Sequence, residues 1–246
     1  MKLAGMGDRL LVDGFDVSGA VGSINKISGG PKALEVTDIT QGAPNRLGGQ
    51  RDAGIDFSAW LEDTPVTGGH AALSSLPTGQ RIVTYLRGTA IGGFSACMIS
   101  RQINYDPNRA NDGGLTIGVS TQSDGFGLEW GEQLTAGLRT DTTATNGTAL
   151  DFGAVSTLFG GQAYLQVNAF TGTSVTVKLQ DSADNATFAD LTGGGFIAAT
   201  ARGAQRLALS NAATVRRYVR VATTGTFSNA VFQVTFVRNL TAGIVF

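Results

Sequence analysis

The sequence predicts an all-β protein made of two consecutive domains. Apolar and polar residues alternate over many short stretches, and no window of a dozen residues carries a sustained helical stripe. Glycine makes up 35 of the 246 residues, about twice its usual share. Pairs such as Gly29-Gly30, Gly48-Gly49 and Gly113-Gly114 predict tight turns between short strands. Short helices are expected only near residues 70–75, stopped by Pro77, and over 128–134.

The first domain is predicted over residues 1–140. In its clearest strand Leu115, Ile117 and Val119 alternate with polar or small residues, because neighbouring side chains of a half-buried strand point to opposite faces. The other strand candidates cover 9–12, a stretch beginning at Leu34 and Val36, 55–60, 82–86 and 94–105.

The second domain is predicted over residues 150–246 as a small β-sandwich. Its strand candidates cover 163–168, 175–180, 218–221 and 232–236, with turn residues between them, as in sandwich domains. The segment 140–147 reads TDTTATNG and lacks bulky apolar residues, so residues 141–149 are expected to be a linker.

Charge and targeting signals limit the classes of function. The net charge of −1 argues against a general nucleic-acid binder. Residues 1–150 hold 11 Lys/Arg and 15 Asp/Glu (−4), whereas residues 151–246 hold 7 Lys/Arg and 4 Asp (+3). The sequence shows neither a signal peptide nor an apolar run long enough to span a membrane, so folding in a cytoplasm is expected.

Residues for bond chemistry are scarce, so we expect no enzyme, no cofactor and no metal site. His70 is the only histidine, and no catalytic signature surrounds it. Cys97 lies in an apolar strand and is expected to be a buried, inert thiol. The chain cannot supply a zinc site of the usual His and Cys composition.

Two polar clusters allow both a functional and a structural interpretation. Asp181, Asp184, Asn185 and Asp190 could offer oxygen ligands to Ca²⁺, but Asp and Asn are also preferred turn residues, and a turn is favoured. The stretch 216–220 would place Arg216, Tyr218 and Arg220 on one strand face. Single-stranded nucleic-acid binders use such faces, but a solvated sheet face is favoured.

Several stretches resemble the major tail tube proteins of long-tailed (siphovirus-type) bacteriophages, particularly those that infect actinobacteria. The resemblance begins with LLVDGFDVSG (10–19), ALEVTDIT (33–40) and RLGGQRDAGIDFSAWLE (46–62). It continues through RIVTYLRG (81–88), INYDPNRANDGGLTIGV (103–119) and GLEWGEQLTAG (127–137). Residues 163–191 and 216–221 are similar to an additional C-terminal domain found in some of these proteins.

The resemblance implies a β-barrel or sandwich with a short helix, followed by a decorating β-sandwich on the outside of the particle. Such subunits form rings, usually hexameric, whose sheets join into one inner barrel, and the rings stack into a hollow tube that delivers DNA to the host. The expected partners are copies of the chain itself and the tape-measure, tail-tip and terminator proteins, with DNA passing through without specific binding and no membrane contact. The expected location is the virion tail, assembled in the host cytoplasm.

A long loop between early strands reaches the next ring in that family. The polar, glycine-rich segment 40–51 (TQGAPNRLGGQR) matches its place, so Arg46, Arg51 and Asp52 are candidates for inter-ring contacts. An ordinary exposed loop is the competing interpretation. The acidic first domain suits a channel wall, because like charge repels DNA phosphates.

Two rival functions remain open at this stage. One is a carbohydrate-binding or capsid-decorating sandwich, for which Tyr164, Phe170 and Tyr218 could be exposed aromatic platforms, although core packing explains them equally well. The other is a hydrolase with an unrecognised site, which the lack of a second histidine disfavours.

Overall fold

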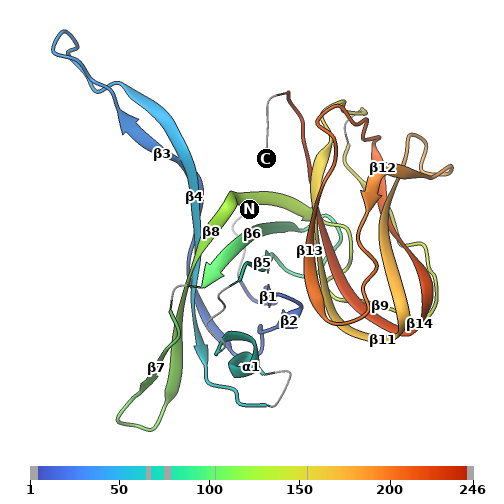
Figure 1. Cartoon of the computed structure of the whole chain (residues 1–246), viewed down its shortest axis with the longest axis horizontal. Coiled ribbons are helices and arrows are strands. Elements are labelled where there is room, and N and C mark those ends of the chain that lie inside the picture. The colour runs from blue at the N-terminus through green and yellow to red at the C-terminus, as the bar shows by residue number, and fades with distance from the viewer. Residues whose placement is uncertain (1–4, 65–67, 75–78, 103, 154, 243–246) are drawn as a thin grey trace.

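The computed structural model describes residues 5–64, 68–74, 79–102, 104–153 and 155–242. Over these residues the predicted all-β fold is confirmed, with one short helix, α1 (Gly69–Leu73). The predicted end of that helix at residues 75 to 77 lies outside the described residues. Figure 1 shows an N-terminal part in blue to green, a C-terminal part in yellow to red, and a two-stranded arm that projects from the N-terminal part.

The N-terminal part is built around the long strand β8 (Leu115–Gln133). Its first half pairs with β4 (Arg46–Trp60) on one side and β7 (Asp106–Arg109) on the other, and its second half pairs with β6 (Phe94–Gln102). β4 pairs in turn with β3 (Val21–Glu35). The remaining strands are β5 (Arg81–Leu86), β1 (Arg9–Val12) and β2 (Phe15–Asp16), which follow β6 in the sheet.

One hydrophobic core supports these strands, and the strands predicted at 9–12, 55–60, 82–86 and 115–119 are confirmed. The strand predicted to begin at Leu34 is wrong, because β3 ends at Glu35. Ile55 and Phe57 from β4 pack with Ile117 and Val119 from β8, and α1 contributes the buried Leu73. The predicted helix over 128–134 is wrong, because residues up to Gln133 belong to β8, and those up to Glu132 pair with β6. Gly131 fits this strand because a Cβ there would lie 2.7 Å from the Phe236 carbonyl oxygen.

The C-terminal part is a long hairpin of β11 (Gly161–Ser182) and β14 (Tyr218–Arg238) that folds over on itself. Register shifts between residues 167 and 174 and the positive φ of Gly172 and Gly225 mark the fold. Both halves of β11 contribute to one core, as Leu165 and Val177 do. The shorter strands are β9 (Arg139–Asp141), β10 (Leu150–Asp151), β12 (Ala189–Gly195) and β13 (Gly203–Ala208).

The two parts share one antiparallel sheet, which remains open. β14 pairs with β8 where Thr235 lies opposite Gln133, and the main strand path runs from β12 to β2, which do not pair with each other. A buried polar layer adds to this contact: the Tyr164 hydroxyl donates to Glu129, and Gln166 Nε2 donates to the Ile82 carbonyl at 3.0 Å. Burial next to Glu129 raises the pKa of Tyr164.

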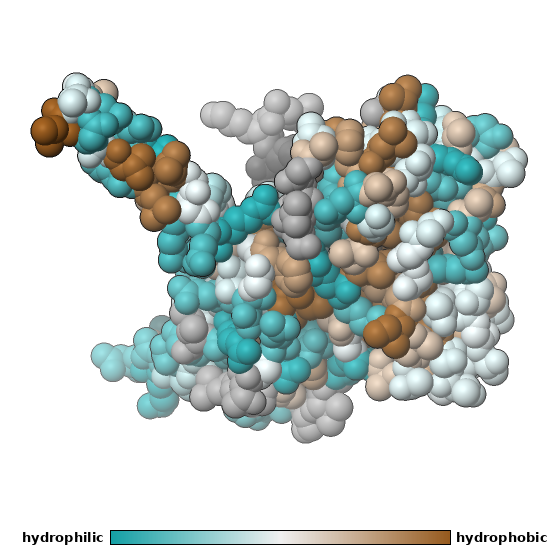
Figure 2. All heavy atoms as spheres, turned by 45° about the horizontal axis from the view of Figure 1, so that its top comes forward, coloured by the Kyte–Doolittle hydropathy of each residue, from teal (hydrophilic) through white to brown (hydrophobic). Residues whose placement is uncertain are grey.

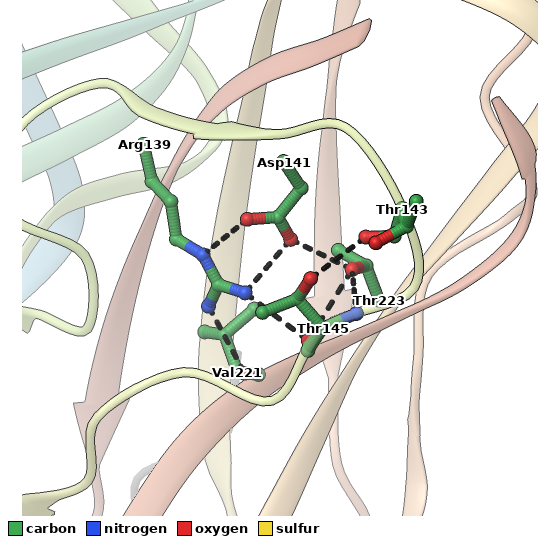
Figure 3. Close-up of polar contacts among 6 residues, drawn as sticks. All are labelled: Arg139, Asp141, Thr143, Thr145, Val221 and Thr223. Carbon is green, nitrogen blue, oxygen red and sulfur yellow. Dashed lines mark hydrogen bonds and ion pairs between the residues drawn. The ribbon is translucent and has the colours of Figure 1, made fainter. Parts of the chain in front are cut away.

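The segment predicted as a linker lies along β14 (Figure 3). The Thr223 hydroxyl donates to Asp141 at 2.7 Å and accepts from the Thr145 amide at 3.0 Å. The Thr223 amide donates to the Thr145 carbonyl at 3.0 Å, and Arg139 forms an ion pair with Asp141 at 2.7 Å. The division into two domains at 141–149 stays a prediction. Asp141 and Thr145 of this segment form hydrogen bonds to Thr223 of β14.

Candidate assembly surface

A projecting arm is formed by residues 29–51, which comprise the end of β3, the connection 36–45 and the start of β4. Every residue of the arm is exposed except Gly49, which is half-buried. The arm projects away from both cores in Figure 1 and forms the upper-left extension in Figure 2. Its strands are held by cross-strand pairing and not by a core.

Large apolar side chains gather on this arm. Leu34 is 53% exposed and lies opposite Leu47, which is 57% exposed, and Ile39 in the connection is fully exposed. Figure 2 shows the matching brown areas at the tip and along one side of the arm. A group of exposed apolar residues on a projecting segment is typical of a surface that another molecule covers.

The base of the arm is fixed by close backbone packing. A Cβ at Gly29 would lie 2.5 Å from Leu128 Cβ, so only glycine allows β3 to approach β8 there. The turns predicted at Gly29-Gly30 and Gly48-Gly49 are wrong, because both pairs lie within strands. The pair Gly113-Gly114 does lie in the turn between β7 and β8, as predicted.

The three predicted inter-ring residues all lie on β4 at or near the arm. Arg46 is its first residue, exposed and opposite Glu35. Arg51 is exposed and lies against the backbone of Gly127, while Asp52 pairs with Lys32 at 3.0 Å. The Lys32 ammonium lowers the pKa of Asp52. The predicted loop ends earlier than expected, because β4 begins at Arg46; contact with another ring stays a prediction for all three.

The outer edge of β3 is open along the strand. Among the described strands β3 pairs only with β4, so one side of its 15 residues presents backbone groups without a strand partner. Such an edge is a template for another chain, and Pro and Lys are residues that restrict unwanted pairing. β3 carries Lys26, Pro31 and Lys32. The edge is therefore available, and its side chains limit which strand can join it.

The residues considered for catalysis do not form a site in the described part of the chain. Nδ1 of His70 lies 2.5 Å from the Tyr105 hydroxyl on an exposed surface. Cys97 is buried, and burial raises the pKa of its thiol to about 12, so the thiolate nucleophile is not formed at neutral pH. No group of three His, Cys, Asp or Glu side chains suited to a metal occurs among the described residues.

Asp181 and Asp184 of the acidic cluster in the C-terminal part accept hydrogen bonds within the fold. Asp184 accepts backbone hydrogen bonds from Ala186 at 3.0 Å and Thr187 at 2.9 Å, which is the predicted turn. These backbone donors and the Ser182 hydroxyl lower the pKa of Asp184 to about 2. Asp181 accepts from the Arg216 amide at 2.8 Å.

The arginine stripe over 216–220 also has partners within the fold. Arg217 forms an ion pair with Asp151 at 2.7 Å, and its guanidinium carbon lies 5.0 Å from the centre of the Tyr218 ring. Arg220 donates to Gln180 at 2.9 Å and covers the Phe188 ring. The predicted single face is wrong at Arg216, which is exposed and precedes β14, whereas Tyr218 and Arg220 lie half-buried on that strand.

None of the three aromatic residues considered for sugar binding is an open platform. Tyr164 is fully buried at the contact between the two parts, which contradicts its role as an exposed platform. Phe170 packs against the C-terminal core, and Arg217 stacks on Tyr218. Core packing, the alternative explanation, therefore holds for Tyr164, because the N-terminal sheet covers the polar face of its strand.

Comparison with known proteins gives matches to solved structures only. No protein-family model matches the chain, and no curated protein sequence matches it. A chain of a native gene transfer agent virion is 15% identical, with a TM-score of 0.41 over 52% of this chain and 98% of its own. The SPP1 Dit protein, a hub of phage adsorption apparatus, is 10% identical, with a TM-score of 0.33 over 95% of this chain and 99% of its own.

A chain of the phage P2 baseplate in its activated conformation with Ca is also 10% identical, with a TM-score of 0.33 over 95% of this chain and 99% of its own. These solved neighbours are parts of phage tails and baseplates and of a gene transfer agent particle. At such TM-scores the likenesses do not establish a family for this chain. In the described part of the chain, no helix has the length and apolarity needed to cross a membrane.

Proposed function

We propose that this chain is a structural subunit of a phage tail, and that copies of it assemble into the rings of a hollow tail tube. The observation that carries the proposal is the arm, with its exposed Leu34, Ile39 and Leu47, together with the open edge of β3. Both features leave apolar surface and backbone groups uncovered in a single copy. A neighbouring copy would cover them without any bond chemistry.

The polar face of the β4 and β8 sheet suits a channel wall. Ile55, Phe57 and Val119 point to the core, so Asp56, Ser58 and Ser120, which alternate with such residues, lie on the opposite face. Lys26 of β3 lies opposite Asp56, so this face carries a cation beside its carboxylate and hydroxyls and presents no net positive charge to DNA phosphates. We propose that this face lines the bore and lets DNA pass without specific binding.

The finer features of the proposal follow the family that the sequence resembles. Rings are proposed to be hexameric, with β3 of one copy joining the sheet of its neighbour. The C-terminal part is proposed to decorate the outside, and the tape-measure, tail-tip and terminator proteins are the proposed partners. The proposed location is the virion tail, after assembly in the host cytoplasm.

Negative-stain electron microscopy and sedimentation velocity on the purified chain test this proposal. A concentration series should give rings or hollow tubes as the concentration rises, because the repeated contacts around a ring form cooperatively. Duplex DNA should not bind the chain at low salt, so raising the salt concentration should release none. A monomer at every concentration, or salt-dependent retention of DNA, would contradict the proposed function.

A further inference from the structure

A hollow lined with aromatic rings lies where the N-terminal sheet meets the C-terminal core. Phe94 of β6 lies opposite Glu132 of β8, and Glu132 lies opposite Phe236 of β14. Trp130 lies two residues before Glu132 on β8, so it is on the same face of the sheet. The hollow has a volume of about 320 Å³, and its lining includes Phe94, Trp130, Glu132, Phe152, Arg238 and Leu240. We call it the aromatic hollow.

Two rings of the aromatic hollow are open to solvent, and a third is fixed by the C-terminal core. Phe94 is 64% exposed and Trp130 is 55% exposed. Phe152 packs its edge against the buried Phe236 ring, with the ring centres 6.0 Å apart and the ring planes at 82°. A concave site with aromatic walls and a few polar groups, formed between two parts of a chain, is typical of small-ligand binding.

Arg238 brings to the aromatic hollow hydrogen-bond donors that the fold leaves unused. The residue is 9% exposed, and its Nη2 donates to the carbonyl oxygens of Val155 at 2.5 Å and Val215 at 3.1 Å. Its Nε and Nη1 are buried and have no hydrogen-bond partner within the described part of the chain. The guanidinium carbon lies 5.4 Å from the centre of the Phe152 ring. Buried donors without acceptors are unfavourable, so a ligand that supplies acceptors here is favoured.

Glu132 gives the aromatic hollow a charge opposite to that of Arg238. Burial of this carboxyl raises its pKa, and the positive charge of Arg238 lowers it by a smaller amount. Glu132 repels an anion and Arg238 repels a cation. The two side chains together therefore favour a neutral ligand that both donates and accepts hydrogen bonds.

A sugar ring has the chemistry that these groups require. The faces of a pyranose carry C–H groups that can pack on aromatic rings, and its hydroxyls both donate and accept hydrogen bonds. The volume of the hollow lies at the lower end of the range for ligand pockets, about 300–1,000 Å³. A purely apolar ligand would leave the Arg238 donors without acceptors. A stable protein contact covers about 1,200–2,000 Å² of surface, far more than a hollow of this size offers.

We propose that the aromatic hollow binds a neutral sugar unit of a glycan, with Trp130 and Phe94 against the ring and with Arg238 and Glu132 hydrogen-bonded to its hydroxyls. The site goes beyond the proposed function, because assembly of a tube does not require it. It also differs from the sugar platforms considered from the sequence, none of which lines the hollow. Its aromatic residues come from three separate segments of the chain, so no local pattern marks them.

The variant Trp60→Phe makes tryptophan emission a reporter of the aromatic hollow, because Trp130 is then the remaining tryptophan of the two. The probes are maltose, cellobiose, lactose and diacetylchitobiose, all neutral disaccharides. Chitobiose and digalacturonate are their cationic and anionic counterparts. At least one neutral probe should change the emission saturably with a Kd of about 1 mM and protect Trp130 from iodide, and the charged sugars should bind more weakly. Absence of a saturable response to every neutral probe at about 10 mM would overturn the proposal.

The variant Phe94→Ser, made in the same background, separates a binding role from a structural one. Phe94 is largely exposed, so the substitution should leave the unfolding midpoint unchanged and weaken binding of the responding disaccharide about tenfold. Leu158→Ser removes a side chain of similar exposure (60%) outside the hollow and should bind as strongly as the chain without it. Equal affinities of the two variants would refute the sugar site.

Sedimentation velocity on the same samples separates this proposal from tube assembly. A Trp130 response that follows association of copies, and not addition of a sugar, would mean that the aromatic hollow is a contact between copies. That result would overturn the sugar site and leave the proposed function intact. Sugar binding by a chain that stays monomeric at every concentration would do the reverse.

Discussion

Arg206 and Glu129 form an ion pair that is buried between the two parts of the chain, with Arg206 Nη2 2.8 Å from Glu129 Oε1. The guanidinium carbon of Arg206 also lies 3.9 Å from the centre of the Phe126 ring. Glu129 and Phe126 belong to β8, which bends near Gly125 and Gly127, both at positive φ. One side chain of the C-terminal part thus braces the bend of the central strand of the N-terminal part.

Replacing Arg206 should therefore destabilise the whole chain. Arg206→Met leaves the Glu129 carboxylate buried with the Tyr164 hydroxyl as its remaining partner, and removing one member of a buried pair costs about 3–5 kcal/mol. Chemical denaturation monitored by tryptophan fluorescence measures the loss. The double variant Arg206→Met with Glu129→Gln should recover part of it. A loss below about 1 kcal/mol for the single variant would show that the pair is not important for folding.

Asp184 should make stability depend on pH at the acidic end. Backbone donors lower its pKa in the folded chain from 3.8 to about 2, so the ionised form is favoured by folding. Its contribution is therefore present above pH 4 and lost as the pH falls through about 2. The unfolding midpoint of Asp184→Asn should lie below that of the unmodified chain at pH 7, and the difference should close between pH 4 and 2. A difference that stays constant over this range would contradict the assignment.

Strand positions could be predicted wherever one face of a strand lies on a core. Ile55, Phe57, Ile117 and Val119 alternate with polar residues and all belong to the N-terminal core. The same rule failed for the polar face of β11, because Tyr164 and Gln166 are buried against the N-terminal sheet. A period of two shows that the faces differ, but it does not show whether a second layer covers the polar one.

The sequence predicted a polar loop over 40–51, which falls within the arm, but it did not predict that residues 29–51 form a hairpin. The strands of this hairpin make cross-strand hydrogen bonds without a core, so the one apolar alternation there, Leu34 and Val36, predicted a strand that begins where β3 in fact ends. The glycine pairs that suggest turns are needed elsewhere, as at Gly29, where close packing on Leu128 leaves no room for a Cβ.

Cys97 should be inert in the folded chain. It is fully buried between Ile82 and Tyr164, and burial raises the pKa of its thiol to about 12. A thiol reagent at pH 8 should therefore modify the native chain only at the rate of unfolding, and modify the denatured chain at once. Cys97→Ser with Ile197→Cys is the control, because residue 197 is 80% exposed and should react in the native state. Rapid modification of native Cys97 would show that the two parts of the chain separate.

Removing the apolar residues of the arm should abolish assembly without affecting the fold. Leu34 and Leu47 are a cross-strand pair, each more than half exposed and remote from both cores, so Leu34→Ser with Leu47→Ser should change unfolding free energy by no more than about 0.5 kcal/mol each. Sedimentation velocity should then find monomers at concentrations where the unmodified chain forms larger species. Ile197→Ser, which removes an equally large exposed side chain from the C-terminal part, should assemble normally. The substitutions leave the rest of the surface unchanged. Normal assembly by the arm variant would therefore show that copies of the chain do not bind one another through the apolar side chains of the arm.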